Sequence, residues 1–350
     1  MRNFTMRKIL MILVFALFTL PLTAQEDTND EWTIIQPGGE TICARGTPYQ
    51  FFVRDIGETN NLMIYFQGGG ACWNAFSCRE GGTFDDDVSD EAELIRYARF
   101  DGIFDFSNEQ NPIADYDLVF IPYCTADIHS GMNQVEFPGE LTINYNGYVN
   151  AATALQWVYE HYDEPERLLI AGSSAGAYGA IYHAPYILQQ YPNAQSVVFG
   201  DAGVGVTPVG WDVLELWNIF ENMPPFIPEL AQVDPDEFTP SMLYQFNAQY
   251  FPDVRFAQFT NAVDEVQIMF FRFSASGNTV EDWINGMYAI LDELDQADNF
   301  NSYVAPGTEH TILGSPEFYT LEVEGVAFID WFQRLLDHEP VENIRCVQCE

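Results

Sequence analysis

The chain has 350 residues, of which 47% are hydrophobic and 15% aromatic, so it has enough apolar surface to build a core and is not intrinsically disordered. Its 52 acidic residues against 13 basic residues give a formal net charge of -39. Nucleic acids and anionic membranes are therefore not expected as partners, because both are bound mainly through clustered Lys and Arg.

Residues 1–24 predict a secretory signal peptide. A basic start with Arg2, Arg7 and Lys8 precedes an apolar run, Ile9–Leu22, and the small residue Ala24 marks the expected cleavage site. An apolar run of about 14 residues is too short to span a bilayer, which needs about 20. We therefore expect a secreted protein, extracellular or periplasmic.

Beyond this segment, apolar runs of strand length alternate with helical patterns. The strand-like runs are Tyr49–Val53, Leu62–Phe66, Leu118–Tyr123, Leu168–Ala171, Val197–Phe199, Phe256–Phe259 and a last one around Tyr303–Ala305. Helical spacing of apolar residues occurs at 151–162, 283–294 and 328–336, and residues 178–190 can also form a helix. This alternation predicts an α/β fold with a mostly parallel sheet and helices on both faces. No repeat or linker divides residues 25–350, so we expect a single domain.

Residues 205–252 interrupt the alternation. This segment is rich in Trp, Phe, Pro and Met and separates two of the strand-like runs. We expect it to form a helical cap over a site.

A glycine block follows the run that ends at Phe66. Its sequence, Gln67-Gly68-Gly69-Gly70-Ala71, allows backbone N–H groups to point into a site, as a developing oxyanion requires. A glycine-rich turn without catalytic use is the simpler alternative. A phosphate cradle is not expected, because the G-K-[ST] signature and a neighbouring lysine are both missing.

The pentapeptide Gly172-Ser173-Ser174-Ala175-Gly176 matches G-x-S-x-G between a strand-like run and a helical segment. In that context the serine sits on a sharp turn with its hydroxyl exposed above the sheet. We therefore predict that Ser174 is a nucleophile and that the Ala175 N–H donates to the oxyanion. Ser173 is one position out of register and is expected to be structural. The alternative is a tight Gly/Ser turn without a catalytic role.

A serine nucleophile needs a base, which in turn is oriented by a carboxylate. In this fold the chain order is serine, acid, histidine. His310 lies in the loop after the last predicted strand and is the predicted base, whereas His338 is better explained as a charge at a helix C-terminus. Asp264 and Asp201 compete as the acid, and Asp264 is preferred because it follows the later strand.

Six cysteines in an exported chain predict disulfides. Six cysteines allow fifteen pairings. The spacing suggests Cys72 with Cys78 and Cys346 with Cys349, which would leave Cys43 for Cys124. The tail pair could instead bind zinc, but no second pair has zinc spacing. An acidic run, Asp85–Asp87 with Asp90 and Glu91, could bind calcium but is interpreted as a solvated loop and helix start. No metal or cofactor is expected.

Together these segments resemble the pectin acetylesterase family. The glycine block, the serine turn, the acid segment Asn261–Gln267 and the loop Pro306–His310 each look like a family motif, as do two further segments. Those two are Cys43-Ala-Arg-Gly-Thr-Pro-Tyr and Tyr123-Cys-Thr-Ala-Asp127-Ile-His129-Ser-Gly131. The resemblance covers residues 41 to about 313, with departures at Ala71, where plant members carry Trp, and at Ser173.

The resemblance implies an α/β-hydrolase fold and a catalytic triad of Ser174, Asp264 and His310. It also implies oxyanion donors at Gly69 and Ala175 with Gly68 or Gly70 adjacent, and it supports pairing of Cys72 with Cys78. It does not say whether Asp127 and His129 line the site or only brace it.

The expected activity is hydrolysis of short-chain acyl esters, including acylated carbohydrates. Pectin itself is a polyanion that so acidic a protein repels. One alternative is a polyester or lipid-ester hydrolase whose segment 205–252 supplies an apolar acyl pocket, and a peptidase with the same triad is another. A third is a non-catalytic carbohydrate-binding protein with Trp73, Trp211 and Trp217 stacking on sugar rings.

Overall fold

A computed structural model of the chain describes residues 32–57, 59–88, 101–208 and 211–349. The predicted signal peptide lies outside the described residues, and so do Asp90 and Glu91 of the acidic run. None of the described helices is both long enough and apolar enough to cross a membrane.

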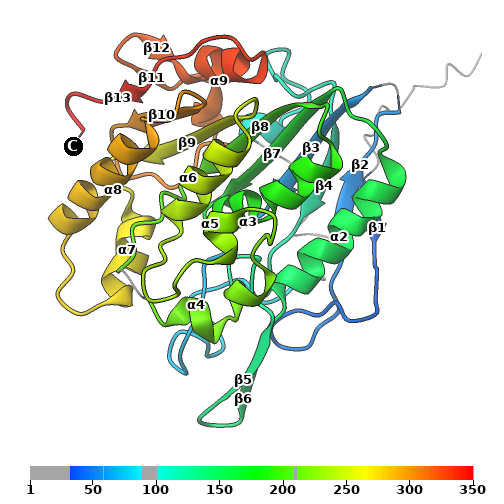
Figure 1. The fold of residues 1–350 in the computed structure, drawn as a ribbon, viewed down its shortest axis with the longest axis vertical. Helices are drawn as coiled ribbons and strands as arrows, with labels where there is room; N and C mark the ends of the chain where they lie inside the picture. The colour runs from blue at the N-terminus through cyan, green and yellow to red at the C-terminus, as the bar shows by residue number, and fades with distance from the viewer. Residues whose placement is uncertain (1–31, 58, 89–100, 209–210, 350) are drawn as a thin grey trace, which may run out of the picture. The chain divides into compact units, whose positions relative to one another are not determined.

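A nine-stranded sheet runs through the described part of the chain in the order β1-β2-β4-β3-β7-β8-β9-β10-β13 (Figure 1). Its strands are β1 (Thr33–Ile35), β2 (Phe51–Arg54), β3 (Asn61–Phe66), β4 (Asp117–Ile121), β7 (Arg167–Ser173), β8 (Gln195–Asp201), β9 (Arg255–Asn261), β10 (Phe300–Ala305) and β13 (Ile344–Arg345). β2 pairs antiparallel with both β1 and β4. The six remaining pairings are parallel, so the expected mostly parallel sheet is confirmed.

The central strands are buried on both faces, and their sequences show it. Every residue of β4 and of β10 is buried, as are all residues of β3 after the first. A strand covered on both faces reads as an apolar run without alternation. The sequence therefore marked β3 and β4 clearly, but of β10 it marked only the end around Tyr303–Ala305, because Asn301 and Ser302 interrupt the apolar run. It missed the two-residue edge strand β13, which is too short to form a pattern.

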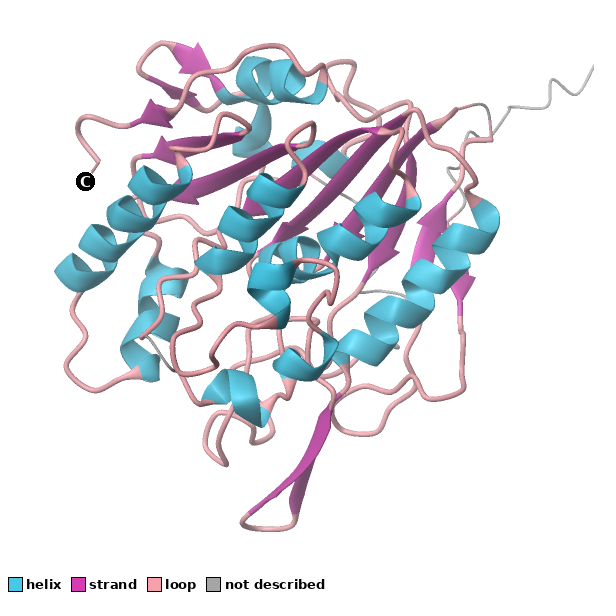
Figure 2. Ribbon diagram, in the orientation of Figure 1, coloured by secondary structure: helices cyan, strands magenta, loops and turns pink. Residues whose placement is uncertain are grey.

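The longer helices of one layer lie in front of the sheet in the view of Figures 1 and 2. They are α2 (Gly147–His161), α3 (Ala175–Gln190), α6 (Ser241–Tyr250) and α8 (Val280–Leu294). Phe66 of β3 stacks on His183 of α3, with 5.4 Å between ring centroids. The next side chain along the strand, Tyr65, instead packs against Phe104 of a short 3-10 helix, Gly102–Phe104. Because successive strand side chains point to opposite faces, that helix covers the other face.

The helix α9 (Phe328–Leu336) also covers the face opposite α3. Phe199 of β8 contacts Phe332 of α9 edge-on at 5.0 Å between ring centroids. A Cβ at the neighbouring Gly200 would instead lie 3.6 Å from Ala177 of α3. Helices therefore pack on both faces, as expected.

The segment 205–252 contains several short helices joined by loops where the structure describes it. It contains α4 (Val213–Leu216), a 3-10 helix (Ile219–Asn222), α5 (Pro228–Ala231) and α6. It is followed by β9 and then by α7 (Glu265–Ser274). Two small hairpins lie outside the main sheet, β5 (Asn133–Phe137) with β6 (Leu141–Tyr145) and β11 (Glu322–Val323) with β12 (Val326–Ala327).

Three disulfides link Cys43 to Cys124, Cys72 to Cys78 and Cys346 to Cys349. The three expected pairings are confirmed, and the alternative of zinc ligation by the tail pair is wrong.

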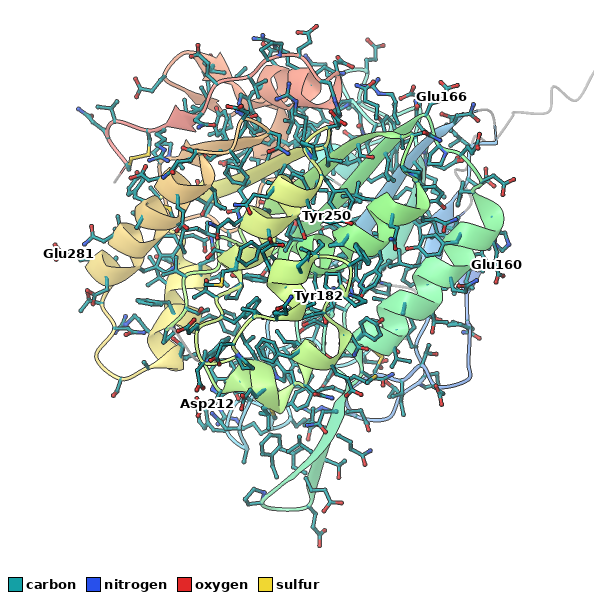
Figure 3. The ribbon with its side chains drawn as sticks, in the orientation of Figure 1. Glu160, Glu166, Tyr182, Asp212, Tyr250 and Glu281 are labelled. Atoms are coloured by element: carbon teal, nitrogen blue, oxygen red, sulfur yellow. A yellow bond between two sulfur atoms is a disulfide. The ribbon has the colours of Figure 1, made fainter. Side chains whose placement is uncertain are left out.

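The acidic side chains labelled in Figure 3, which are Glu160, Glu166, Asp212 and Glu281, are all exposed, whereas Tyr182 is buried. Carboxylates at the surface stay hydrated, which is how a chain of this charge can fold.

Candidate active site

The parallel strands end at one edge of the sheet, and the predicted site residues follow these ends. The glycine block follows β3, Ser174 follows β7, Asp264 lies three residues after β9, and His310 lies five residues after β10. Ligands of open α/β sheets bind at this edge, outside the carboxyl ends of the strands.

Ser174 occupies a sharp turn between β7 and α3. Its φ of 56° is in the left-handed region, which is strained for a non-glycine residue. The turn is close-packed, since a Cβ at Gly172 would lie 2.1 Å from the Gly176 carbonyl oxygen and one at Gly176 would lie 1.9 Å from that of Phe66. The Ser174 N–H donates to the Asp201 carbonyl oxygen at 2.7 Å. These contacts present the serine as the G-x-S-x-G pattern predicts.

Asp264 and His310 form a hydrogen-bonded pair. The Nδ1 atom of His310 lies 3.0 Å and 2.9 Å from the two carboxylate oxygens of Asp264. Because an ionised carboxylate can only accept, Nδ1 carries the proton and Nε2 is left as the acceptor. Nε2 is buried and has no hydrogen-bond partner among the described residues. The imidazole is therefore held in the tautomer that a general base requires.

The Asp264 carboxylate is fully buried and is held by α7. It caps that helix by accepting from the N–H groups of Val266 at 3.0 Å and Gln267 at 2.9 Å. The side-chain Nε2 of Gln267 also donates to it at 3.0 Å and to Thr260 Oγ1 at 2.9 Å. Gln267 is not among the site residues predicted from the sequence, although an acidic N-cap followed three residues later by Gln is a known helix-start signal. The neighbouring Glu265 is exposed.

The competing acid, Asp201, is hydrogen-bonded to Ser173 and to the loop after His310, not to the imidazole of His310. Its buried carboxylate accepts from Ser173 Oγ at 2.7 Å and from the N–H groups of Ile312 and Leu313 at 2.9 Å. Burial raises the pKa of Asp201 to about 6. Asp201 thus holds the loop that follows His310, and the prediction that Ser173 is structural agrees with its hydrogen bond.

The other competing residue, His338, lies just beyond the C-terminal end of α9, as expected. Its Nε2 lies 3.1 Å from the Ser196 carbonyl oxygen, and burial lowers its pKa. The lowered pKa works against the charge that the sequence-based interpretation assigned to this residue.

The glycine block packs directly against the serine turn. A Cβ at Gly68 would lie 2.6 Å from the Ser173 carbonyl oxygen and 2.9 Å from the Ser174 Cβ. Among the described residues, no acceptor is found for the backbone N–H of Gly68, Gly69 or Ala175. For Ala175 this follows from its place in the first turn of α3, where N–H groups lack intrahelical acceptors. Such N–H groups are suited to bind negative charge.

Two cavities meet at Ser174 and His310, both of which line each of them. The inner cavity, about 80 Å³, has a mainly aromatic wall formed by Tyr178, Trp211, Trp217, Phe270, Phe271 and Trp283. The outer cavity, about 490 Å³, is lined by the glycine block and by polar side chains that include Gln67, Thr83, Asp85 and Asp101. The site therefore has a small apolar side and a larger polar side.

Part of the inner wall comes from the segment 205–252, through Val206, Trp211, Trp217 and Pro240. Trp217 is fully buried, and its Nε1 donates to the Cys72 carbonyl oxygen at 3.0 Å. Because Trp217 has no exposed surface, the suggestion that it stacks on sugar rings is wrong. Trp73 and Trp211 pack against each other at 5.4 Å between ring centroids.

Among the described residues, no group of three or more His, Cys, Asp or Glu side chains is placed to hold a metal ion.

A family model described as Pectinacetylesterase matches residues 23–222, which include the glycine block and Ser174 but not Asp264 or His310. The human palmitoleoyl-protein carboxylesterase Notum is 24% identical over 195 residues, which are 52% of this chain and 38% of the human protein. Pectin acetylesterase 4 of Arabidopsis thaliana is 24% identical over 176 residues, which are 50% of this chain and 41% of the plant protein. The matches thus cover less than half of the length of these relatives.

Among solved structures, the Wnt deacylase Notum from Drosophila superposes with a TM-score of 0.63 at 16% identity. The superposition covers 88% of this chain and 94% of that chain. This likeness confirms the expected α/β-hydrolase fold.

Proposed function

The chain belongs to the pectinacetylesterase family, and on that premise we propose that it is a serine esterase in which Ser174, His310 and Asp264 act as a catalytic triad. The observation that carries this proposal is the unpartnered Nε2 of His310, whose Nδ1 is tied to Asp264 and whose ring lines the same two cavities as Ser174. No other described histidine lines either cavity.

In the proposed mechanism, Nε2 of His310 takes the Ser174 proton as the hydroxyl oxygen attacks the ester carbonyl carbon. Asp264 orients the imidazole and stabilises the imidazolium that forms. The alcohol leaves with the proton from His310, and water, activated by the same nitrogen, then releases the acyl group from Ser174.

The negative charge of the tetrahedral intermediate is assigned to backbone N–H groups of the glycine block and of α3. Gly69 and Ala175 are the proposed donors, with Gly68 adjacent. Their lack of protein acceptors among the described residues supports this assignment. Loss of one such donor lowers kcat by about 100-fold to 1,000-fold in related chemistry.

The inner cavity favours a short acyl group. An apolar cavity of about 150 Å³ can bind a six-carbon ring, so the present one is sized for an acyl chain of roughly two to four carbons. Its volume is about 80 Å³. The lipid-ester alternative needs a longer pocket, although the aromatic wall suits it. The outer cavity is then left for the alcohol, such as a sugar, and three disulfides fit the proposed secretion.

Hydrolysis of a chromogenic acetyl ester tests the proposal. The purified wild-type chain should release the chromophore, and Ser174→Ala should not. Equal rates would remove the assignment of Ser174 and favour a non-catalytic, carbohydrate-binding role. Acetyl, butyryl and octanoyl esters of the same alcohol would then separate a short-acyl esterase from a lipid-ester hydrolase.

A further inference from the structure

His129 is a buried histidine that the proposed mechanism does not use, and it forms a hydrogen bond with the first residue of the glycine block. The Nε2 atom of His129 lies 2.8 Å from the carbonyl oxygen of Gln67. A carbonyl oxygen can only accept, so Nε2 carries a proton and donates it to this bond. The Gln67 carbonyl shares a peptide unit with the Gly68 N–H, and the two groups of a trans peptide point in opposite directions. The imidazole thereby sets the direction of the Gly68 N–H.

The glycine block is held at a second carbonyl as well. The Asp85 N–H donates to the Gly69 carbonyl oxygen at 2.9 Å, and the Gln67 N–H donates to that of Ile121 at 2.9 Å. With these bonds in place, the peptide between Gln67 and Gly68 has little freedom left. The bond from His129 holds the first peptide of the turn, so its loss would free the Gly68 N–H to change direction.

The imidazole of His129 is fitted between the glycine block and the nucleophile helix. It is 2% exposed and packs against Phe66 and Tyr123, with ring centroids 5.3 Å and 4.8 Å away. A Cβ at Gly179 would lie 2.8 Å from its Cδ2 atom. Gly179 is one turn after Ala175 in α3. One side chain therefore touches both elements that supply the proposed oxyanion donors.

The loop that contains His129 has a strained backbone conformation. Ala126, Ile128 and His129 have φ values of 66°, 53° and 62°, a region that non-glycine residues rarely adopt. Strain of this kind persists where the surroundings over-determine the conformation, and it clusters at functional sites.

Buried polar groups keep this loop in place. The Asp127 carboxylate accepts from Thr125 Oγ1 and from the Gly147 N–H, both at 2.7 Å. His183 of α3 donates from Nε2 to the His129 carbonyl oxygen at 2.8 Å. Burial lowers the pKa of His129 to about 3, so the ring stays neutral over the working range of an esterase. A single N–H donor without charge thus faces the Gln67 carbonyl.

We propose that His129 is a positioning residue for the oxyanion site: its Nε2–H fixes the Gln67–Gly68 peptide so that the glycine N–H groups meet the negative charge that develops on the substrate. This inference rests on the proposed esterase function. It resolves whether His129 lines the site or braces it, since the residue touches the donor-bearing turn and neither cavity.

The test compares His129→Phe, which keeps an aromatic ring without a donor, with His129→Gln, which restores an N–H donor. Activity on a soluble acetyl ester is measured together with the affinities of a trifluoromethyl ketone and the matching methyl ketone. The fluorinated ketone adds to the serine and forms an oxyanion, whereas the methyl ketone mainly reports ground-state binding. His338→Phe is the matched control, because it removes a histidine donor to a backbone carbonyl far from the site.

We expect His129→Phe to lower kcat by about 10-fold to 100-fold with KM within about twofold, because small misplacements of catalytic groups cost up to about 100-fold. The affinity for the trifluoromethyl ketone should fall by a similar factor, and that for the methyl ketone should not change. His129→Gln should recover most of the loss, and His338→Phe should behave as wild type.

Wild-type kcat and inhibitor affinity in a folded His129→Phe variant would overturn the inference, as would an equal loss for both ketones, which would indicate a collapsed cleft. If His129→Phe does not fold, His129→Met replaces it as the donorless partner of His129→Gln, and equal kcat in that pair would overturn the inference. Ser174→Ala keeps the two proposals separate. If it is inactive while His129→Phe is fully active, only the inference about His129 fails.

Discussion

Asp264 accepts the Nδ1–H of His310 at 2.9 Å while the same carboxylate caps α7. One buried side chain therefore orients the imidazole and starts the helix whose Phe270 and Phe271 line the inner cavity. Asp264 therefore fixes both the orientation of the proposed base and the start of the helix that forms part of the inner cavity wall.

Replacement of Asp264 by Asn should nearly abolish catalysis. The amide cannot hold Nδ1–H in the same way, and the wrong tautomer then faces Ser174, for which losses of about 10,000-fold in kcat are known. Steady-state hydrolysis of an acetyl ester measures this. The neighbouring Glu265→Gln is the control, because Glu265 is exposed, and it should stay within about twofold of wild type. A large loss in Glu265→Gln with an active Asp264→Asn would reassign the acid.

Replacement of Gly68 by Ala should lower kcat strongly, whereas the same replacement at a glycine away from the site should not. The added methyl would lie 2.9 Å from the Ser174 Cβ and 2.6 Å from the Ser173 carbonyl oxygen. The turn must shift, so we expect kcat to fall by about 100-fold or more. Gly81→Ala is the control for backbone strain, since nothing lies within 4 Å of its added methyl and the strain from its φ of 64° falls on a residue that lines neither cavity. If both variants hydrolyse the ester equally well, the glycine block has no role in catalysis.

Enlarging the inner cavity should change acyl selectivity. Phe271→Ala removes part of its wall, and each accommodated methylene is worth about 10-fold or more in kcat/KM. The ratio of octanoyl to acetyl kcat/KM should therefore rise at least about tenfold. Phe273→Ala on the same helix should leave the ratio unchanged, because Phe273 is 52% exposed and lines neither cavity. An unchanged ratio in Phe271→Ala would place the acyl chain elsewhere.

Asp201 should make stability depend on pH. Burial raises its folded pKa from 3.8 to about 6, so the folded chain keeps the proton at pH values where the unfolded chain has lost it. This contribution is complete below about pH 4 and is lost as the pH rises through about 6. The free energy of unfolding of wild type relative to Asp201→Asn should therefore be about 2 kcal/mol larger at about pH 4.5, where wild type is more stable, than at about pH 7.

Urea unfolding at the two pH values measures this difference. Asp212→Asn, at an exposed position, is the control and should show no such change. The same difference between wild type and Asp201→Asn at both pH values would mean that the carboxyl group does not titrate in this range.

The sequence determined the features that depend on neighbours along the chain. The strand-like runs, the G-x-S-x-G turn at Ser174 and the two short disulfides are all local patterns. The order of serine, acid and histidine then selected Asp264 and His310, and the structure places these two in direct contact. Chain order was informative because parallel strands bring their carboxyl ends to one edge.

The tertiary structure decided everything that depends on which side chains meet across the sheet edge. The contact of His129 with the Gln67 carbonyl joins residues 62 positions apart, Asp201 reaches the Ile312 N–H across 111 positions, and Trp217 reaches the Cys72 carbonyl across 145. No periodicity encodes such pairings, because they follow from how the loops pack after the strands have aligned. The same packing, and not composition, buries Trp217 and sets the size of the inner cavity.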